Sequence, residues 1–489
     1  MKRFSPALLL LILAFCSPQP SEKAVQARPA LTLEDLEDLM EELQAHPSLK
    51  HAMIGAYVMD LDSGSVWLDY HSQWGMATGS TMKAVTTATA LASLGADFQF
   101  QTKLGYTGEV QDGVLKGDLF IVGGGDPTLG IKNLSQLWQR WTQALQKAGI
   151  RKIEGDIVGE ASFFDPYLLP RTWIWEDLGN YYGAGACALN IHENYYRLNL
   201  KTASPGKPTR ILGLRPDVPE LAFQNELLSG PVGSGDKGYI FGAPFTYNRV
   251  LRGTIPPNRS RFTLKGALPD PALQTAQWLQ AYLKKKGIAS EEARGSYRNP
   301  PAESTLTFID TLYSPKLSEI VDKTNTKSVN TYAEAMLKMM GKELGEGGST
   351  KAGAKAVMEF WKKKGLGMEG FVMEDGSGLS RFNAITPKQM TGILAQCSLK
   401  PWHKEFNGSL AVAGKTGTLR RMCRNSVAKG RVFAKSGYIN RVRCYTGYAH
   451  TTKGKRVAFA IMVNNFVGEY KALTPLFEQF FDTLVRADR

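Results

Sequence analysis

The sequence lacks the features that mark a membrane-embedded protein or a metal enzyme. No apolar run after residue 15 approaches the length of a transmembrane helix, which excludes a chain that crosses a membrane repeatedly. The chain has only six histidines, and none of them forms a His-Glu-x-x-His or similar pair. We therefore expect neither a metal ion nor a cofactor in this protein.

Cysteine is also scarce, with five residues in a chain of 489. Apart from Cys16, the cysteines have a spacing that matches no metal-binding or disulfide framework. These four are Cys187, Cys397, Cys423 and Cys444. A disulfide between Cys423 and Cys444 stays open, because the sequence neither requires nor forbids it.

The N-terminus carries a short apolar run. Lys2 and Arg3 precede apolar residues from Ala7 to Phe15, which is the pattern of a secretory signal. We therefore expect an exported protein in the periplasm or the outer cell envelope. Two ways of processing fit the residues that follow. Cys16 ends a lipoprotein-like stretch and would carry a lipid anchor, or cleavage follows Ala27 instead.

Acidic residues are outnumbered by basic ones. The chain has 59 Lys and Arg residues against 45 Asp and Glu residues, and its formal net charge at pH 7 is +14. Such a charge suits an anionic partner. Because an exported protein rarely meets nucleic acid, we expect an anionic cell-wall polymer or a membrane surface as the partner, and no nucleic acid. A generally basic surface with no such partner is the alternative.

The pattern of apolar residues along the chain predicts a helix-rich part that is interrupted by a β-rich part. Strand-like residues 52–60 and 66–70 precede an apolar helix that starts near Ser80. Short strands with tight turns begin near residue 98, and longer helices return near residue 300. We expect an α/β (α+β) fold with one split domain. Its expected parts are a signal peptide and linker (1–30), a first part of the main domain (31–97), an inserted accessory region (98–300) and a second part of the main domain (301–489).

Ser80 and Lys83 are the first candidate catalytic pair. Ser-x-x-Lys occurs four times, at Ser80, Ser204, Ser234 and Ser426, but only Ser80 opens a long apolar helix. Helical residues three apart share a face, so the hydroxyl and the amine can meet there. A serine nucleophile needs a base, and burial can keep a lysine neutral enough to serve as one. The alternative is a helix N-cap serine beside a solvated lysine.

Ser328 and Asn330 form a second candidate pair. Ser328-Val329-Asn330 is the only Ser-x-Asn in the chain, and it precedes another apolar helix. There a hydroxyl can relay a proton and an amide can hold a substrate carbonyl. The alternative for Ser328 is again a helix N-cap.

A third element would be a cation on a strand, beside backbone N–H groups that bind an oxyanion. Lys415-Thr416-Gly417 and Lys435-Ser436-Gly437 compete for this role. We choose Lys435, because it lies in a predicted strand whereas the residues after Lys415 show no strand alternation. Between Lys415 and Arg443 there are nine Lys or Arg residues and no acid. This stretch is either a solvated basic face or a region that attracts a carboxylate-ended substrate.

The three elements, in this order, resemble the serine penicillin-recognising enzymes. The chain is most similar to the class C low-molecular-mass penicillin-binding proteins, which are D-alanyl-D-alanine carboxypeptidase/endopeptidases. The resemblance implies a β-lactamase/transpeptidase-like domain, and this family inserts extra domains between the first and second motifs. Its third motif usually has Thr where this chain has Ser436, and its second usually has Asp where this chain has Val329. The matching stretches are Ser80 to Lys83, Gly123 to Thr128, Trp173 to Asp177, Ser314 to Leu317, Ser328 to Asn330, Asp375 to Arg381 and Lys435 to Gly437.

The resemblance implies a role for each candidate residue. Ser80 would attack the carbonyl between two D-amino acids, Lys83 would take its proton, and Ser328 would relay one to the leaving group. Lys435 is expected to lower the pKa of Lys83 by repulsion. The implied substrate-binding residues are Asn330 for the peptide carbonyl, Lys435 and Ser436 for the terminal carboxylate, and the backbone N–H groups of Ser80 and Tyr438 for the oxyanion.

Some members of the family also bind the third residue of the stem peptide, a diamino acid. The matching positions here are Asp177, Tyr182, Arg381 and Asn440. Asp177 would pair with an ammonium group and Arg381 with a carboxylate. The alternatives are aromatic packing for Tyr182 and a structural ion pair for Arg381.

The resemblance predicts a D,D-peptidase that acts on peptidoglycan stem peptides or cross-links and is acylated by β-lactam antibiotics at Ser80. A β-lactamase or esterase on the same core is a second hypothesis. The large insertion and the lack of an obvious deacylation carboxylate speak against it. A catalytically silent peptidoglycan-binding scaffold is the third, and the intact Ser80, Lys83 and Ser328 speak against that.

Overall fold

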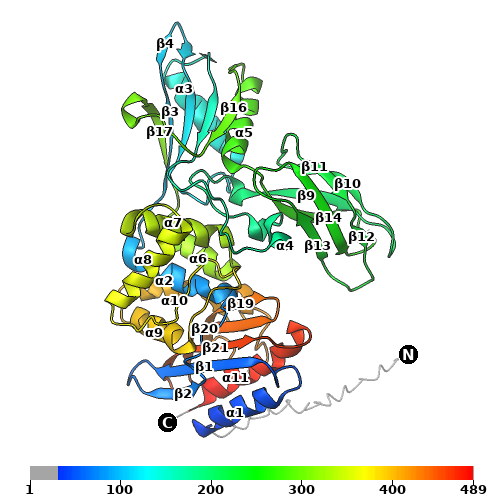
Figure 1. The fold of residues 1–489 in the computed structure, drawn as a ribbon, viewed down its shortest axis with the longest axis vertical. Helices are drawn as coiled ribbons and strands as arrows, with labels where there is room; N and C mark the ends of the chain where they lie inside the picture. Colours follow the sequence, from blue (N-terminus) through cyan, green and yellow to red (C-terminus); the bar gives the residue numbers. More distant parts are fainter. Residues whose placement is uncertain (1–30, 488–489) are drawn as a thin grey trace, which may run out of the picture.

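The computed structural model describes residues 31–487 and places them in two regions, a lower one with both described ends and an upper one made by the middle of the chain (Figure 1). The lower region is built on one antiparallel six-stranded sheet. Its strands, in spatial order, are β18 (Ala411–Val412), β19 (Val432–Ile439), β20 (Val442–His450), β21 (Arg456–Asn464), β1 (Met53–Asp60) and β2 (Val66–Tyr70).

Helices cover both faces of this sheet. The helices α1 (Glu34–Ala45) and α11 (Thr474–Arg486) pack on one face (Figure 1). The other face carries the helical layer that holds the candidate catalytic residues. It consists of α2 (Met82–Leu94), α6 (Leu317–Lys327), α7 (Asn330–Leu344), α8 (Thr350–Lys363), α9 (Pro387–Ser398) and α10 (His403–Ser409).

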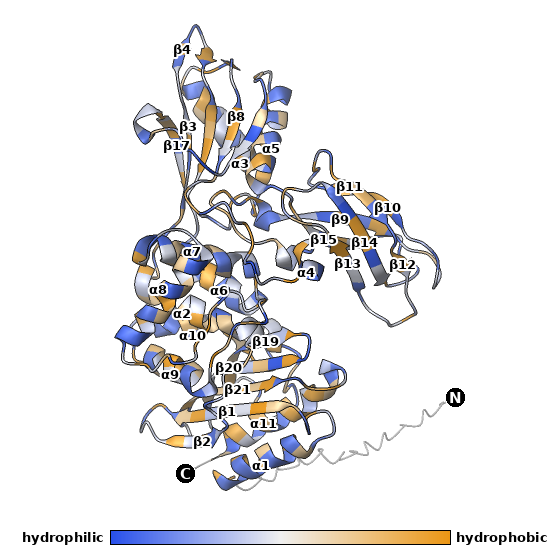
Figure 2. Cartoon of the chain, in the orientation of Figure 1, coloured by the Kyte–Doolittle hydropathy of each residue, from blue (hydrophilic) through white to orange (hydrophobic). Residues whose placement is uncertain are grey.

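The strands alternate between two apolar cores, as side chains on successive strand residues must. On β21, Phe459 and Ile461 pack toward α1 and α11, whereas Ala460 and Met462 pack toward the helical layer. Apolar residues accordingly make up much of the central strands (Figure 2). Cys423, which lies between β18 and β19, and Cys444 of β20 belong to different cores. All four described cysteines are buried free thiols, so the disulfide that the sequence left open does not form.

The upper region contains a mixed five-stranded sheet and a second, smaller β unit (Figure 1). The five-stranded sheet has the order β16 (Ala293–Ser296), β8 (Ile157–Glu160), β6 (Leu119–Gly123), β3 (Gln101–Tyr106) and β17 (Thr307–Tyr313), with helices α3 (Leu134–Lys147) and α5 (Pro271–Lys285). A short three-stranded sheet beside it consists of β4 (Glu109–Gln111), β5 (Val114–Lys116) and β7 (Lys152–Ile153).

The second β unit consists of two small sheets. One has the order β10 (Arg210–Arg215), β9 (Tyr195–Lys201) and β15 (Phe262–Ala267). The other joins β11 (Ala222–Asn225), β14 (Asn248–Ile255) and β12 (Leu228–Ser229), with β13 (Lys237–Phe241) paired to β14. The short helix α4 (Trp175–Leu178) lies beside β13, at the end of this unit nearest the rest of the molecule (Figure 1).

Single helical turns complete the described elements. They are η1 (Gly79–Thr81), η2 (Tyr181–Gly183), η3 (His192–Asn194), η4 (Glu303–Thr305), η5 (Gly417–Leu419) and η6 (Tyr470–Leu473). Within residues 31–487, no helix combines the length and the apolar character needed to cross a membrane.

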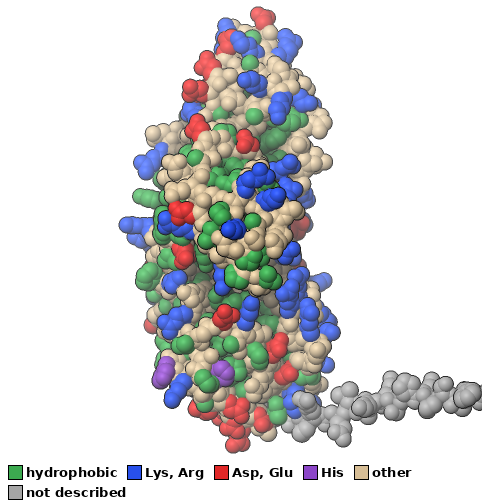
Figure 3. Space-filling view, turned by 90° about the vertical axis from the view of Figure 1, so that its right-hand side faces the viewer, with side chains coloured by type: hydrophobic (Ala, Val, Ile, Leu, Met, Phe, Trp, Pro, Cys, Tyr) green, Lys and Arg blue, Asp and Glu red, His purple; other side chains and the backbone are tan. Residues whose placement is uncertain are grey.

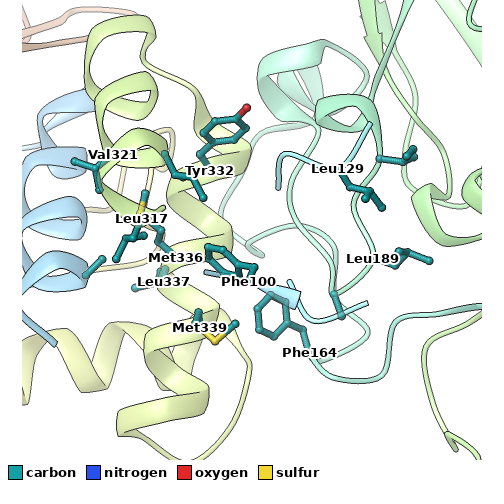
Figure 4. Close-up of a cluster of buried hydrophobic side chains, with 14 of the residues drawn as sticks. Phe100, Leu129, Phe164, Leu189, Leu317, Val321, Tyr332, Met336, Leu337 and Met339 are labelled. Atoms are coloured by element: carbon teal, nitrogen blue, oxygen red, sulfur yellow. The ribbon is translucent and has the colours of Figure 1, made fainter. Parts of the chain in front are cut away.

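The return from the upper to the lower region comes later than residue 300. Strand β17 (Thr307–Tyr313) pairs with β3, so it belongs to the upper sheet. We therefore propose that the inserted part ends near residue 313. The junction is apolar, since Phe100 and Phe164 from the insertion pack against Met336 and Met339 of α7 (Figure 4). This packing fixes the insertion beside the helical layer that carries the candidate site.

Candidate active site

Ser80 lies in the 3₁₀ turn η1, which leads directly into the buried helix α2. Two glycines allow other segments to pack tightly against this turn. A Cβ atom on Gly378 would lie 1.8 Å from the carbonyl oxygen of Gly79, and one on Gly437 would lie 3.2 Å from the Ser80 nitrogen. The serine is therefore held between β19 and the loop that joins α8 to α9.

The Lys83 amine faces three oxygen atoms, and its side chain is fully buried. Its Nζ lies 3.1 Å from Ser80 Oγ, 2.6 Å from Asn330 Oδ1 and 2.6 Å from the carbonyl oxygen of Ser377. The amide oxygen and the carbonyl oxygen can only accept hydrogen bonds. A neutral amine would donate its two N–H groups to them and leave its lone pair for the Ser80 hydroxyl.

Burial lowers the pKa of Lys83 to about 7, although the carboxyl groups of Asp375 and Glu334 act in the opposite direction. The pKa of Glu334 is itself raised, to about 8, mainly by burial and then by Asp375. The sequence analysis expected repulsion from Lys435 to lower the Lys83 pKa, but burial is the main cause. The pKa of Lys435 is lowered as well, by burial first and by repulsion from Lys83 second.

Ser328 joins α6 to α7 in the left-handed backbone conformation, with φ 59° and ψ 44°. It is not the helix N-cap of the alternative interpretation, since Val329 occupies that position. Its Oγ accepts a hydrogen bond of 3.0 Å from Lys435 Nζ, which also donates to the carbonyl oxygen of Ser436 at 2.9 Å. The Ser436 hydroxyl lies 2.7 Å from Thr418 Oγ1. Ser328 thus contacts the amine of Lys435.

The two rival Lys-x-Gly segments lie in different surroundings. Lys435 is fully buried on β19, whereas Lys415 is exposed on the segment that joins β18 to η5. The backbone of β19 also reaches Ser80, because a Cβ atom on Gly79 would lie 2.8 Å from the Tyr438 nitrogen. The structure therefore brings Lys435 and Tyr438, and not Lys415, to the Ser80 turn.

A family model described as "D-Ala-D-Ala carboxypeptidase 3 (S13) family" matches residues 36–475. The chain belongs to this family. The D-alanyl-D-alanine carboxypeptidase of Actinomadura sp. is 29% identical over 479 residues, which cover 94% of this chain and 86% of that protein. D-alanyl-D-alanine carboxypeptidase DacB of Haemophilus influenzae is 26% identical over 426 residues, or 84% and 85% of the two chains.

A solved structure gives the same result for the fold of this S13 family member. Penicillin binding protein 4 from Haemophilus influenzae superposes with a TM-score of 0.79 at 25% identity, and the match covers 92% of this chain and 98% of that one. The predicted α+β fold and the predicted enzyme class, a serine-type D-Ala-D-Ala carboxypeptidase, are confirmed.

The structure brings together three of the four residues that were predicted to bind the third stem residue. Tyr182 and Arg381 both lie close enough to the Asp177 carboxyl group to act on its pKa, which each of them lowers. Burial is the main reason that the pKa of Asp177 is raised. Asn440 lies in the exposed turn between β19 and β20, and among residues 31–487 no side-chain hydrogen bond joins it to the other three.

The backbone of Tyr182 also ties the insertion to the candidate base. Asn330 Nδ2 donates to the Tyr182 carbonyl oxygen at 2.7 Å, which turns Asn330 Oδ1 toward Lys83. The alternative interpretation of Arg381 was a structural ion pair. Within residues 31–487, no carboxylate lies within ion-pair distance of Arg381, so this alternative does not apply. Its guanidinium group is exposed and available to a ligand.

Three residues of the site were missed by the sequence analysis, namely Glu334, Ser377 and Thr418. Glu334 follows Asn330 by one helical turn, so its position on the same face of α7 was a usable signal. Ser377 contributes a carbonyl oxygen, which any residue type could supply, and Thr418 lies in a connector without a pattern. Between residues 31 and 487, no three His, Cys, Asp or Glu side chains are grouped as a metal site requires.

Proposed function

We propose that this S13 family member hydrolyses the bond between two D-amino acids in peptidoglycan stem peptides, with Ser80 as its nucleophile. One observation carries the proposal. The buried Lys83 amine has two partners that can only accept hydrogen bonds, and its third contact is Ser80 Oγ. Family membership supports the class of substrate.

The proposed reaction uses these groups in turn. Ser80 Oγ attacks the peptide carbonyl carbon while its proton passes to Lys83 Nζ. The backbone N–H groups of Ser80 and Tyr438 would stabilise the oxyanion. The C–N bond then breaks, and the proton held by Lys83 passes through the Ser328 hydroxyl to the leaving amine. Water then attacks the Ser80 ester and gives a proton to Lys83, which returns it to Ser80 Oγ as the shortened peptide leaves.

Substrate binding would use both regions of the molecule. Lys435 and the hydroxyls of Ser436 and Thr418 would hold the carboxylate of the leaving residue. Asp177 would bind an ammonium group on the third stem residue, and Arg381 a carboxylate. Tyr182 would keep the Asp177 carboxylate in place. A β-lactam, which presents a strained amide and a carboxylate, would acylate Ser80 through the same contacts.

The experiment compares D-alanine release from a stem pentapeptide by the wild type and by Ser80→Ala. We expect the wild type to release D-alanine and Ser80→Ala to lose the activity. Ser204→Ala is the matched control, because Ser204 is an exposed serine in another Ser-x-x-Lys segment. Release by Ser80→Ala at the wild-type rate would refute the proposal. Rapid destruction of penicillin without D-alanine release would favour the β-lactamase hypothesis.

We also infer export of the protein, with a lipid anchor at Cys16. Both Cys16 and the alternative cleavage point after Ala27 lie outside the described residues. The net charge of +14 supports an anionic cell-envelope partner. The mass of the N-terminal peptide from protein extracted from cells distinguishes a lipid-modified Cys16 from a chain that begins after Ala27.

A further inference from the structure

Two carboxyl groups near the candidate base are almost completely buried. Acidic side chains usually lie at the surface, as they do on the face of the molecule shown in Figure 3. Glu334 of α7 and Asp375 of the loop between α8 and α9 have exposed fractions of only 1% and 0%. Within residues 31–487, no ion pair joins either carboxyl group to a cation. Hydrogen bonds must therefore compensate for the loss of water around them.

Three consecutive backbone N–H groups supply such hydrogen bonds. Glu334 Oε1 accepts the N–H of Ser377 at 2.8 Å, and Glu334 Oε2 accepts that of Gly376 at 3.2 Å. Asp375 Oδ1 accepts the N–H of Gly378 at 2.7 Å. Glu334 therefore uses both of its oxygen atoms as acceptors, which an ionised carboxylate does best.

The peptide group between Gly376 and Ser377 is held at both ends. Its N–H binds Glu334, and its carbonyl oxygen, on Gly376, accepts the hydroxyl of Thr86 at 2.7 Å. Because a trans peptide group is planar, these two hydrogen bonds fix its orientation. A Cβ atom on Gly376 would lie 2.8 Å from the carbonyl oxygen of Ala333, so the loop also lies directly against α7.

The next carbonyl group of this loop contacts the candidate base. The carbonyl oxygen of Ser377 accepts a hydrogen bond of 2.6 Å from Lys83 Nζ. Because Ser377 belongs to both peptide groups, a rotation of the first would carry this oxygen away from the amine. The amine would then lose one of the two acceptors that leave its lone pair for Ser80 Oγ. Glu334 thus acts on Lys83 through the backbone of the loop.

We propose that Glu334 is a positioning residue for acylation, whose carboxylate holds the loop so that the Ser377 carbonyl oxygen keeps the Lys83 amine directed at the nucleophile. This inference rests on the proposed function, in which Lys83 is the base. Asn330 Oδ1, the other acceptor of the amine, lies one helical turn before Glu334. The N-terminal part of α7 would therefore set both acceptors of Lys83.

The test measures acylation by penicillin in Glu334→Gln at about pH 9, above the pKa values of both Lys83 and Glu334. A glutamine amide has the same shape but offers one acceptor oxygen to two N–H groups. Stopped-flow kinetics separate the dissociation constant of the non-covalent complex from the rate constant of the chemical step. We expect this rate constant to fall about tenfold and the dissociation constant to change less than about twofold.

Thr86→Val is the second variant, because it releases the other end of the same peptide group without removing a charge. The rate constant of the chemical step should fall about threefold, as the loss of one hydrogen bond predicts. The control is Glu343→Gln, which removes an exposed carboxylate from the same helix and should leave both constants unchanged. If Glu334→Gln does not fold, Thr86→Val decides alone.

Two results would overturn the inference. One is a chemical step as fast in Glu334→Gln as in the wild type, since Glu334 would then only stabilise the fold. The other is a wild-type rate constant in Thr86→Val, because the orientation of the peptide group would then not matter. Failure of the proposed function itself would look different, because the wild type would then form no penicilloyl group on Ser80.

Discussion

At the scale of the residue, the function depends on whether the Lys83 amine is neutral. Its partners Asn330 Oδ1 and the Ser377 carbonyl oxygen would also accept bonds from an ammonium group, so they do not decide the question. Burial decides it, by bringing the pKa of Lys83 to about 7. Near neutral pH, a substantial fraction of the enzyme then holds the base in its active form.

This predicts the pH dependence of acylation. The neutral form of Lys83 increases as pH rises through its pKa, so the second-order rate constant for acylation by penicillin should rise through about pH 7 and then level off. The measurement is stopped-flow acylation between about pH 5 and about pH 9, with the fold checked by circular dichroism at each pH. A rise that continues toward the ordinary lysine pKa of about 10.4 would show that burial does not activate Lys83.

A second residue-scale prediction separates the rival lysines. Lys435→Ala should slow acylation by penicillin about a hundredfold or more, because it removes the amine that contacts Ser328 and the proposed carboxylate subsite. Lys415→Ala should be acylated at nearly the wild-type rate, because Lys415 is exposed on the segment that joins β18 to η5. The assignment of the third motif fails if only Lys415→Ala is impaired.

The sequence indicated these candidate groups, because each has a side chain that the proposed chemistry requires. Ser80, Lys83, Ser328 and Lys435 could be selected by residue type, order and position relative to helices and strands. What was not predictable is the environment. The cause of the Lys83 pKa, for example, is burial by residues far away in the chain, which no local pattern reveals.

At the scale of the element, the position of Ser80 depends on close contact between the η1 turn and the loop after α8. Gly378 has φ +81° and leaves no room for a Cβ atom. The η1 turn is correctly positioned only if both segments keep this contact. A change that disturbs the contact should therefore lower both the unfolding free energy and the rate of acylation.

Gly378→Ala tests this link, with Gly365→Ala as a control at the same φ of +81° but with open space around the missing Cβ atom. The control should lose about 1 kcal/mol of unfolding free energy, from the left-handed conformation alone. Gly378→Ala should lose about 3 kcal/mol or more, because overpacking adds to that strain, and should acylate slowly. Urea unfolding and acylation rates measure both. Equal effects of the two variants would contradict the proposed role of the contact.

Helices and strands were largely predictable, but their junctions were not. The strands expected over 52–60 and 66–70 correspond to β1 and β2, and the apolar helix expected near Ser80 corresponds to α2. Ser328, in contrast, lies at a left-handed junction between two helices, and helix propensity does not predict this conformation.

At the scale of the whole molecule, the insertion takes part in the site. Tyr182 of the insertion orients Asn330, and Asp177 lies near Arg381 of the other region. The late return through β17 was missed because its pairing partner β3 lies about two hundred residues earlier, and such long-range pairing leaves no local trace. We therefore propose that the insertion bears on specificity as well as on architecture.

This arrangement predicts for which substrates kcat/KM falls most when the carboxylate of Asp177 is removed. Asp177→Asn should lower kcat/KM about tenfold for a peptide with a free ammonium group on its third residue, and little for the same peptide after acetylation. Glu176→Gln is the control, because it removes an exposed neighbouring carboxylate. If Asp177→Asn affects both peptides equally, Asp177 has a structural role and does not bind the ammonium group.

The most direct measurement is the mass of the protein after incubation with penicillin, followed by proteolytic mapping of the modified residue. Our account predicts one penicilloyl group per chain, attached to Ser80, and none on Ser80→Ala. An unmodified wild-type protein, or a stable adduct on any residue other than Ser80, would contradict it.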